Sequence, residues 1–160
     1  MCSAWPWTLS FDAMTTLRSL IFAPLLVVWL ATQALPAMAA EWVLIANNKS
    51  GITRLTQDAV TNIYLGRYRR LDSGITADPI DQPDDSPLKA HFYRRLVDKN
   101  LPEINAYWAR LVFSGKTQPP RTAHTSEEAL QWVIRQPGAL AYIERAKVDS
   151  RVMVVFEMAD

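Results

Sequence analysis

Residues 42–46 read Trp-Val-Leu-Ile-Ala, and the turn-rich segment 47–51 (Asn-Asn-Lys-Ser-Gly) follows them. A short apolar run without a polar residue is typical of a strand that is buried on both faces of its sheet. Both faces of such a sheet have to be covered by other elements, and helices are the usual cover. Helices are therefore expected in the rest of the sequence.

Four helices are predicted from their start signals. Thr56 and Ser86 are good N-caps, and a proline follows Ser86 at the first helical position. A third helix follows Pro102 and has Trp108 at the centre of its apolar stripe, so we expect this indole to be buried against the sheet. Residues 125–128 (Thr-Ser-Glu-Glu) have the pattern of a capping box that opens a fourth helix.

Three further segments have the composition of strands: residues 75–80, 139–143 and 151–156. The alternation of strands and helices predicts a single α/β domain over residues 41–160, with a mixed or mostly parallel sheet of about four to five strands covered by helices. In sheets of this kind, ligands bind at the carboxyl ends of strands, where helix N-termini point inward.

The first forty residues have the pattern of a signal peptide. Met14 and Arg18 frame a short basic region, the apolar run 20–30 follows, and residues 37–40 (Ala-Met-Ala-Ala) form an A-x-A cleavage signal. We predict a signal peptide over 1–40 with its true start at Met14, cleavage near Ala39 or Ala40, and a periplasmic mature protein. The alternative is a retained membrane anchor, because about twenty mostly apolar residues can span a bilayer.

Composition excludes several function classes. The chain has 160 residues, 21% charged residues and a formal net charge of +1. This near-neutral balance argues against nucleic acid as a partner, because nucleic-acid binding needs a strongly basic face. The only cysteine, Cys2, lies in the predicted signal peptide, so the mature chain has no thiol chemistry.

No catalytic constellation can be assembled from the remaining residues. His91 and His124 are far apart in sequence and have no metal-ligand spacing, and no nucleophile elbow or glycine-rich phosphate loop is present. His91 is interpreted as a half-exposed helix residue, and His124, just before a helix, as a residue that could contact an anion there. We therefore predict no enzyme activity, no metal site and no cofactor.

Two segments rich in charged residues are expected to lie at the solvent-exposed surface. The four aspartates of residues 78–85 lack the spacing of a calcium loop and are interpreted as a solvated acidic loop. Residues 67–70 (Arg-Tyr-Arg-Arg) form a short basic patch with one aromatic residue. Outside the cytoplasm, a solvated face or an acidic partner is its expected environment.

A resemblance to a known family rests on several phrases in a fixed order. They are Val43–Asn47, Leu55-Thr56, Ile63–Gly66, Asp85-Ser86 with Phe92, Tyr107-Trp108, Phe113–Lys116, and Val133 with Gln136–Tyr142. In this order the chain resembles the phosphate ABC transporter substrate-binding proteins of the periplasmic-binding-protein superfamily. Full-length members have two lobes with the anion between them, and this chain is similar to one lobe of a type II periplasmic binding protein.

The resemblance implies a set of site residues. Ser86, Lys89 and Ser126 would bind phosphate or another oxyanion. Pro87 and Leu88 stand where the family has glycine and threonine, which removes one N–H and one hydroxyl from the anion cradle. The alternative interpretation makes Ser86 merely an N-cap and leaves Lys89 solvated.

Two functions follow from the resemblance. The first is an exported solute-binding-like protein that binds phosphate or another small oxyanion for an ABC transporter. The second is a non-catalytic lobe, without a ligand, that is reused in the periplasm for protein–protein interaction or sensing. The implied partners are accordingly a small anion and a membrane transporter or sensor protein.

Overall fold

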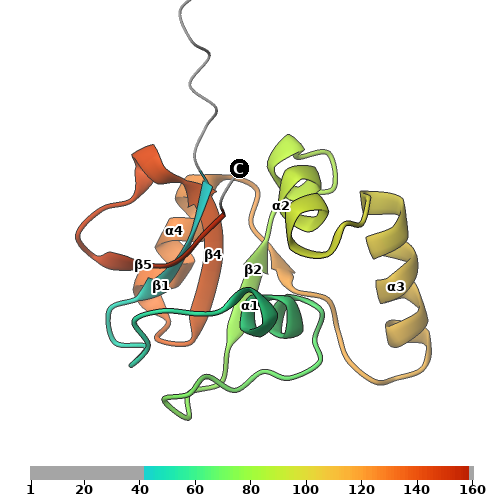
Figure 1. Cartoon of the computed structure of the whole chain (residues 1–160), viewed down its shortest axis with the longest axis horizontal. Helices are drawn as coiled ribbons and strands as arrows, with labels where there is room; N and C mark the ends of the chain where they lie inside the picture. Colours follow the sequence, from blue (N-terminus) through green and yellow to red (C-terminus); the bar gives the residue numbers. More distant parts are fainter. Residues whose placement is uncertain (1–41, 159–160) are drawn as a thin grey trace, which may run out of the picture. The chain divides into compact units, whose positions relative to one another are not determined.

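The computed structural model describes residues 42–158, so the predicted signal peptide and its cleavage site lie outside the described residues. The elements run along the chain in the order β1 (Trp42–Asn47), α1 (Gln57–Tyr64), β2 (Asp78–Asp81), α2 (Pro87–Val97), α3 (Leu101–Phe113), β3 (Arg121–Thr122), α4 (Ser126–Arg135), β4 (Ala139–Glu144), the 3-10 helix η1 (Arg145–Lys147) and β5 (Val152–Glu157) (Figure 1). They form one α/β unit, as predicted.

The five strands form one mixed sheet in the order β3-β2-β4-β1-β5. Strand β2 is parallel to both β3 and β4, whereas β1 is antiparallel to both β4 and β5. The predicted sheet was mixed or mostly parallel, and the structure has the mixed form. The short β3 lies outside the segments that were predicted to be strands.

Alternating side chains of the central strands separate two apolar cores. Leu44 of β1 and Tyr142 of β4 face α1 and α2 on one side, in a cluster that α3 also joins through Ile104. Val43 and Ile143 face the opposite side, where they pack with apolar residues of α4. Figure 1 shows the same division, with α1, α2 and α3 lying apart from α4. The buried run predicted at 42–46 is thus confirmed as a strand covered on both faces.

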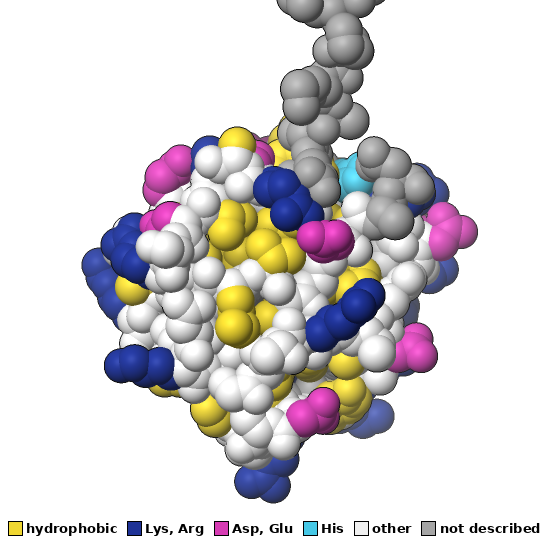
Figure 2. Space-filling model, turned by 60° about the vertical axis from the view of Figure 1, so that its left-hand side comes forward, with side chains coloured by type: hydrophobic (Ala, Val, Ile, Leu, Met, Phe, Trp, Pro, Cys, Tyr) yellow, Lys and Arg dark blue, Asp and Glu magenta, His cyan; other side chains and the backbone are white. Residues whose placement is uncertain are grey.

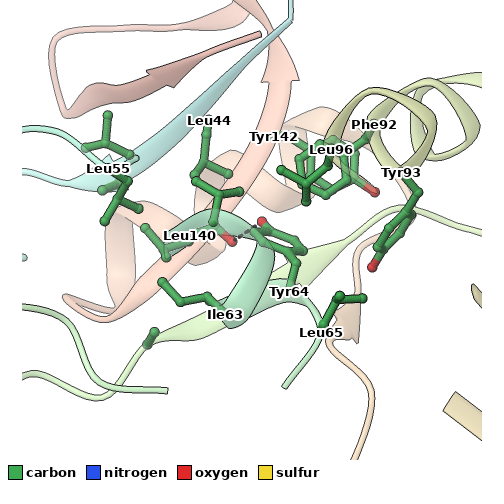
Figure 3. Packing of buried hydrophobic residues seen from close by; sticks show 14 of the residues in the cluster. Leu44, Leu55, Ile63, Tyr64, Leu65, Phe92, Tyr93, Leu96, Leu140 and Tyr142 are labelled. Atoms are coloured by element: carbon green, nitrogen blue, oxygen red, sulfur yellow. Dashed lines mark hydrogen bonds between the residues drawn. The ribbon is translucent and has the colours of Figure 1, made fainter. Parts of the chain in front are cut away.

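Aromatic rings form the centre of the larger core (Figure 3). The Phe92 ring of α2 stacks on the Tyr142 ring of β4, with centroids 4.0 Å apart and planes at 8°. Tyr64 of α1 packs edge-on against Phe92, and its hydroxyl donates to the carbonyl of Leu140 at 3.1 Å. This stack ties α1 and α2 to the sheet and so fixes where α2 begins.

Three of the four helix starts agree with the sequence signals, whereas the start of α3 and the capping box of α4 differ. The N-caps Thr56, Ser86 and Thr125 are confirmed. Helix α3 begins at Leu101 rather than after Pro102, because Asn100 forms a capping box with Glu103. At α4, the expected capping box is wrong.

The carboxylate that should have closed that box makes a different bond. Glu128 accepts from the backbone N–H of His124 at 2.7 Å, one residue before the N-cap. The Thr125 hydroxyl still accepts from the N–H of Glu128 at 3.1 Å. One half of the predicted box is therefore present, and the other half ties the preceding residue to the helix start.

Trp108 is buried, as predicted, with 7% of its surface exposed, but its expected packing against the sheet is wrong because α3 packs on α2. Its indole lies on Gly66, where an added Cβ would come within 2.8 Å of the ring. Gly66 also has a φ of +66°, which favours glycine, and it follows Leu65, the C-cap of α1. Glycine at this position thus allows both the turn after α1 and the close approach of α3.

The face that carries the edge strand β5 is partly apolar. Figure 2 brings this side of the molecule forward and shows hydrophobic side chains gathered near its centre. The β5 residues Met153, Val154 and Phe156 are half-buried, which agrees with a strand at the edge of the sheet. None of the helices within 42–158 has the length and apolar character that a membrane-spanning helix needs.

Candidate functional site

The starts of α2 and α4 open onto one pocket. Strand β2 ends at Asp81 and its parallel neighbour β3 ends at Thr122, in register with each other. From these two ends the chain turns into the N-caps Ser86 and Thr125. The two helix N-termini therefore lie at the same edge of the sheet, at the carboxyl ends of parallel strands, where ligands bind in α/β folds.

Two of the three predicted ligand residues line this pocket. It has a volume of about 370 Å³ and is lined by Trp42, Gln82, Ser86, Pro87, Leu88, His124, Thr125, Ser126, Glu127, Glu144 and Lys147. Ser86 is half-buried, and its hydroxyl oxygen accepts a long, 3.5 Å bond from the N–H of Lys89. Ser126 is buried at the first position of α4. The pocket thus brings together residues that are forty positions apart.

Lys147 supplies the pocket's lysine side chain, which sequence analysis did not single out. Its ammonium lies 2.8 Å from a carboxylate oxygen of Glu127 and 3.6 Å from one of Glu144. The hydrogen bond from Lys147 lowers the pKa of Glu127, and the same bond raises the pKa of Lys147. The pocket is therefore polar and charged, but its cation is offset by two carboxylates.

Lys89, the third predicted ligand residue, is turned away from the pocket. Its ammonium lies 3.2 Å from a carboxylate oxygen of Asp81 and 2.6 Å from one of Asp84. Only 8% of the side chain is exposed. The alternative interpretation of a solvated Lys89 is wrong, because the lysine is a buried ion-pair partner.

Asp81 is the centre of a buried polar network at the carboxyl end of β2. Tyr93 of α2 donates to one of its oxygens at 3.0 Å, and Tyr142 of β4 donates to the other. The backbone N–H of Gln82 also donates to the carboxylate at 2.9 Å. The interpretation of residues 78–85 as a solvated acidic loop is therefore wrong for Asp81, which is 3% exposed.

The network changes the ionisation of its members. Burial and the charge of Asp81 raise the pKa values of Tyr93 and Tyr142 well above the ordinary value, so both phenols stay protonated donors. The hydrogen bond from Lys89 lowers the pKa of Asp84, whose side chain is largely exposed. The buried cation, the carboxylates and the phenols satisfy one another without a ligand.

The two histidines considered in the sequence lie at or near the surface. His124 is exposed and lines the pocket, whereas His91 is half-buried on α2. Within residues 42–158, no three His, Cys, Asp or Glu side chains are grouped so that they could hold a metal ion. A larger hollow of about 820 Å³ lies between residues 53–57 and the edge strand β5, away from the predicted ligand residues.

Comparison with solved structures identifies the fold. A protein from Clostridium perfringens described as a phosphate ABC transporter substrate-binding protein, with bound phosphate, is 18% identical at a TM-score of 0.57, over 72% of this chain and 44% of its own. An ABC-type phosphate transport receptor from Vibrio cholerae is 14% identical at a TM-score of 0.57, over 72% of this chain and 45% of its own. The fold is that of one substrate-binding-protein lobe.

The likeness is limited in extent and in sequence. The chain covers less than half the length of either solved structure. No protein-family model matches the sequence, and no curated protein matches it. Both neighbours are described as binding or receptor proteins rather than as enzymes.

Proposed function

We propose that this protein is an exported, single-lobe solute-binding-like protein, and that the pocket at the starts of α2 and α4 receives a small oxyanion such as phosphate. The meeting of Ser86 and Ser126 in one pocket carries the proposal. Helix N-termini present unpaired N–H groups and the positive end of the helix dipole, both of which favour an anion. The phosphate bound to the Clostridium protein of the same fold supports this choice of ligand class.

Glu127 supports the idea that this location favours negative oxygen atoms. Its carboxylate lies 2.8 Å from the Lys147 ammonium, and the hydrogen bond from Lys147 is the main cause that lowers its pKa. An entering oxyanion would compete with Glu127 for Lys147. The internal carboxylate therefore indicates both the chemistry of the pocket and a reason for weak binding.

Weak binding is also expected from the donors that remain. Pro87 offers no N–H, and Lys89 is held by Asp81 and Asp84. Two charge-assisted hydrogen bonds of about 1.5–3 kcal/mol each correspond to roughly millimolar binding by this single lobe. A second lobe supplied by another chain would add the contacts that this one lacks.

Calorimetric titration of phosphate into residues 38–160 tests the pocket. This stretch forms a compact unit that holds the whole sheet and both cores, so it can be studied alone. Ser86→Ala and Ser126→Ala should weaken binding, whereas Glu127→Gln should tighten it several-fold by releasing Lys147. Thr122→Ala is the matched control, because this exposed β3 hydroxyl does not line the pocket. Phosphate binding by none of these proteins, Glu127→Gln included, would reject the anion pocket.

Export is tested separately from ligand binding. The proposed signal peptide predicts that the protein isolated from the periplasmic fraction begins at Ala40 or Glu41. N-terminal sequencing of that fraction decides this. A protein that begins at Met1 or Met14 would instead support a retained anchor.

The second candidate function is a non-binding lobe used for contact with a transporter or sensor protein. It is favoured by the charges, because both lysines near the helix starts are already paired with two carboxylates each. The Glu127→Gln titration distinguishes the two functions. Phosphate binding that appears only in this variant would favour the non-binding lobe.

A further inference from the structure

Exposed hydrophobic side chains are concentrated at one corner of the described structure. Within residues 42–158, the large hydrophobic side chains with high exposure are Tyr68, Val112 and Phe113. Tyr68 follows α1, and the other two end α3. Phe113 is 96% exposed, which is unusual for a phenylalanine in a soluble domain.

The two segments that carry these residues lie side by side. Gly66 packs against Trp108 and Thr117, and the guanidinium of Arg69 donates to the carbonyl of Gln118 at 2.5 Å. Residues 66–70 and 110–118 are therefore one surface, which we call the α3 corner. Figure 1 shows α3 on the outer side of α2, away from the sheet.

The α3 corner has charges of one sign only. Its two segments contain five cations and neither aspartate nor glutamate; the cations are Arg67, Arg69, Arg70, Arg110 and Lys116. Arg67 donates to the side-chain amide oxygen of Asn62. Arg69 and Arg70 donate to the backbone carbonyls of Gln118 and Gly74. None of the five forms an ion pair within the described part of the chain, so their charges are not offset locally.

A groove continues the corner along α3. It has a volume of about 540 Å³ and is lined by Leu65, Arg67, Val97, Lys99, Glu103, Ile104, Ala106, Tyr107 and Arg110. Ala106, Arg110 and Phe113 fall on one face of the helix at i, i+4 and i+7 spacing, so groove and corner form a continuous surface. Two guanidinium groups thus border an apolar floor next to a protruding aromatic ring.

We propose that the α3 corner docks on the surface of a membrane that contains anionic phospholipid. Five cations and no acidic residue in the two segments of the α3 corner match a negative surface, which attracts each lysine or arginine near it. Glu103 in the groove is paired with Lys99 at 2.9 Å. Phe113 and Tyr68 would enter the interfacial layer, and a lipid headgroup would meet Arg67 and Arg110 at the groove. Protein interfaces also use arginine and aromatic residues, so an acidic protein is the competing occupant. The single sign of charge in both segments favours the uniformly charged surface of a membrane.

Vesicle sedimentation with residues 38–160 tests the proposal independently of the anion pocket. The protein should bind vesicles of phosphatidylcholine with about one third phosphatidylglycerol, and not pure phosphatidylcholine vesicles. Binding should weaken as salt is raised. Arg67→Gln with Arg110→Gln should lower the partition coefficient about 25-fold, at about fivefold for each charge removed. Phe113→Ser should lower it about tenfold or more.

Matched variants separate this surface from a general charge effect. Lys49→Gln with Arg135→Gln removes the same charge from exposed positions outside the α3 corner and should leave binding unchanged. Phe113→Trp should retain binding. Equal loss in the Lys49/Arg135 control, or equal binding to both vesicle types, overturns the proposal. Binding to neither vesicle type also overturns it, and favours an acidic protein as the occupant.

Discussion

Two lysines of this fold each pair with two carboxylates, but they differ in how far they are buried. Lys89 lies between Asp81 and Asp84, and Lys147 lies between Glu127 and Glu144. The Lys89 side chain is 8% exposed, whereas that of Lys147 is 37% exposed. A buried charge cannot be compensated by water, so Lys89 cannot leave Asp81 and Asp84 to bind a ligand without a large loss of stability. The triad of Lys147, Glu127 and Glu144 remains open to rearrangement, and only it lines the pocket.

Residue type and position in the sequence do not identify the lysine that is available to a ligand in this chain. Lys89 follows the predicted N-cap closely and has the positive charge that anion binding needs. That charge is instead paired with Asp81 and Asp84 in the interior. Lys147 comes after β4 in the short helix η1, with no local sequence pattern around it. The cation available to a ligand is therefore identified by burial, because the two lysines are alike in residue type and in the kind of partner.

The largest expected effect removes the buried cation. Lys89→Met should lower the free energy of unfolding by about 3–5 kcal/mol, because it leaves Asp81 buried without its counter-ion. Lys147→Met, the matched change in the exposed triad, should lower it by no more than about 1 kcal/mol. Urea denaturation of both variants measures the difference. Equal effects of the two substitutions would contradict the distinction between the triads.

A smaller effect is expected from the phenols around Asp81. Tyr142→Phe removes one hydroxyl that donates to the carboxylate and keeps the ring that stacks on Phe92. The loss of this charge-assisted bond should lower the free energy of unfolding by about 1.5–3 kcal/mol. The control is Tyr107→Phe, whose hydroxyl donates to the carbonyl of Leu65 at the half-buried edge of the core. If both variants unfold at the same urea concentration, the bond from Tyr142 to Asp81 stabilises the fold no more than the bond from Tyr107 to Leu65 does.

Local signals explain which parts of the fold could be predicted. The N-caps Thr56, Ser86 and Thr125 depend on neighbouring residues, and sequence analysis found all three. The two-residue strand β3 is too short to show a period, and its pairing with β2 is decided by the register of a distant segment. Local chemistry therefore predicted the helices better than the edge of the sheet.

The candidate site divides in the same way. Ser86 and Ser126 were named from the family resemblance, and the structure brings them to one pocket. The burial of Asp81 could not be predicted, because Tyr142, sixty-one residues further along, donates to it only in the folded sheet. In sequence, Asp81 is one of four aspartates in a polar segment, and nothing there distinguishes it from Asp85.

The smallest expected effect concerns the exposed member of the buried triad. The hydrogen bond from Lys89 lowers the pKa of Asp84 in the folded protein, so folding favours its ionised form. This contribution is fully present above the unfolded pKa of about 3.9 and disappears as the pH falls through the lower, folded value. At pH 7, Asp84→Asn should therefore reduce the free energy of unfolding by about 0.5–1 kcal/mol, a modest amount because 66% of the side chain is exposed.

The pH dependence separates this charge effect from a simple loss of packing. As the pH falls through the lowered pKa of Asp84, its carboxyl becomes protonated and the difference between Asp84→Asn and wild type should vanish. Asp85→Asn, one residue further along and exposed, is the control and should match wild type at both pH values. Urea midpoints at neutral and acid pH measure all three proteins. A deficit of Asp84→Asn that persists unchanged in acid would show that Asp84 acts through its hydrogen bond to Asn105 or through packing, and that Lys89 is neutralised by Asp81 alone.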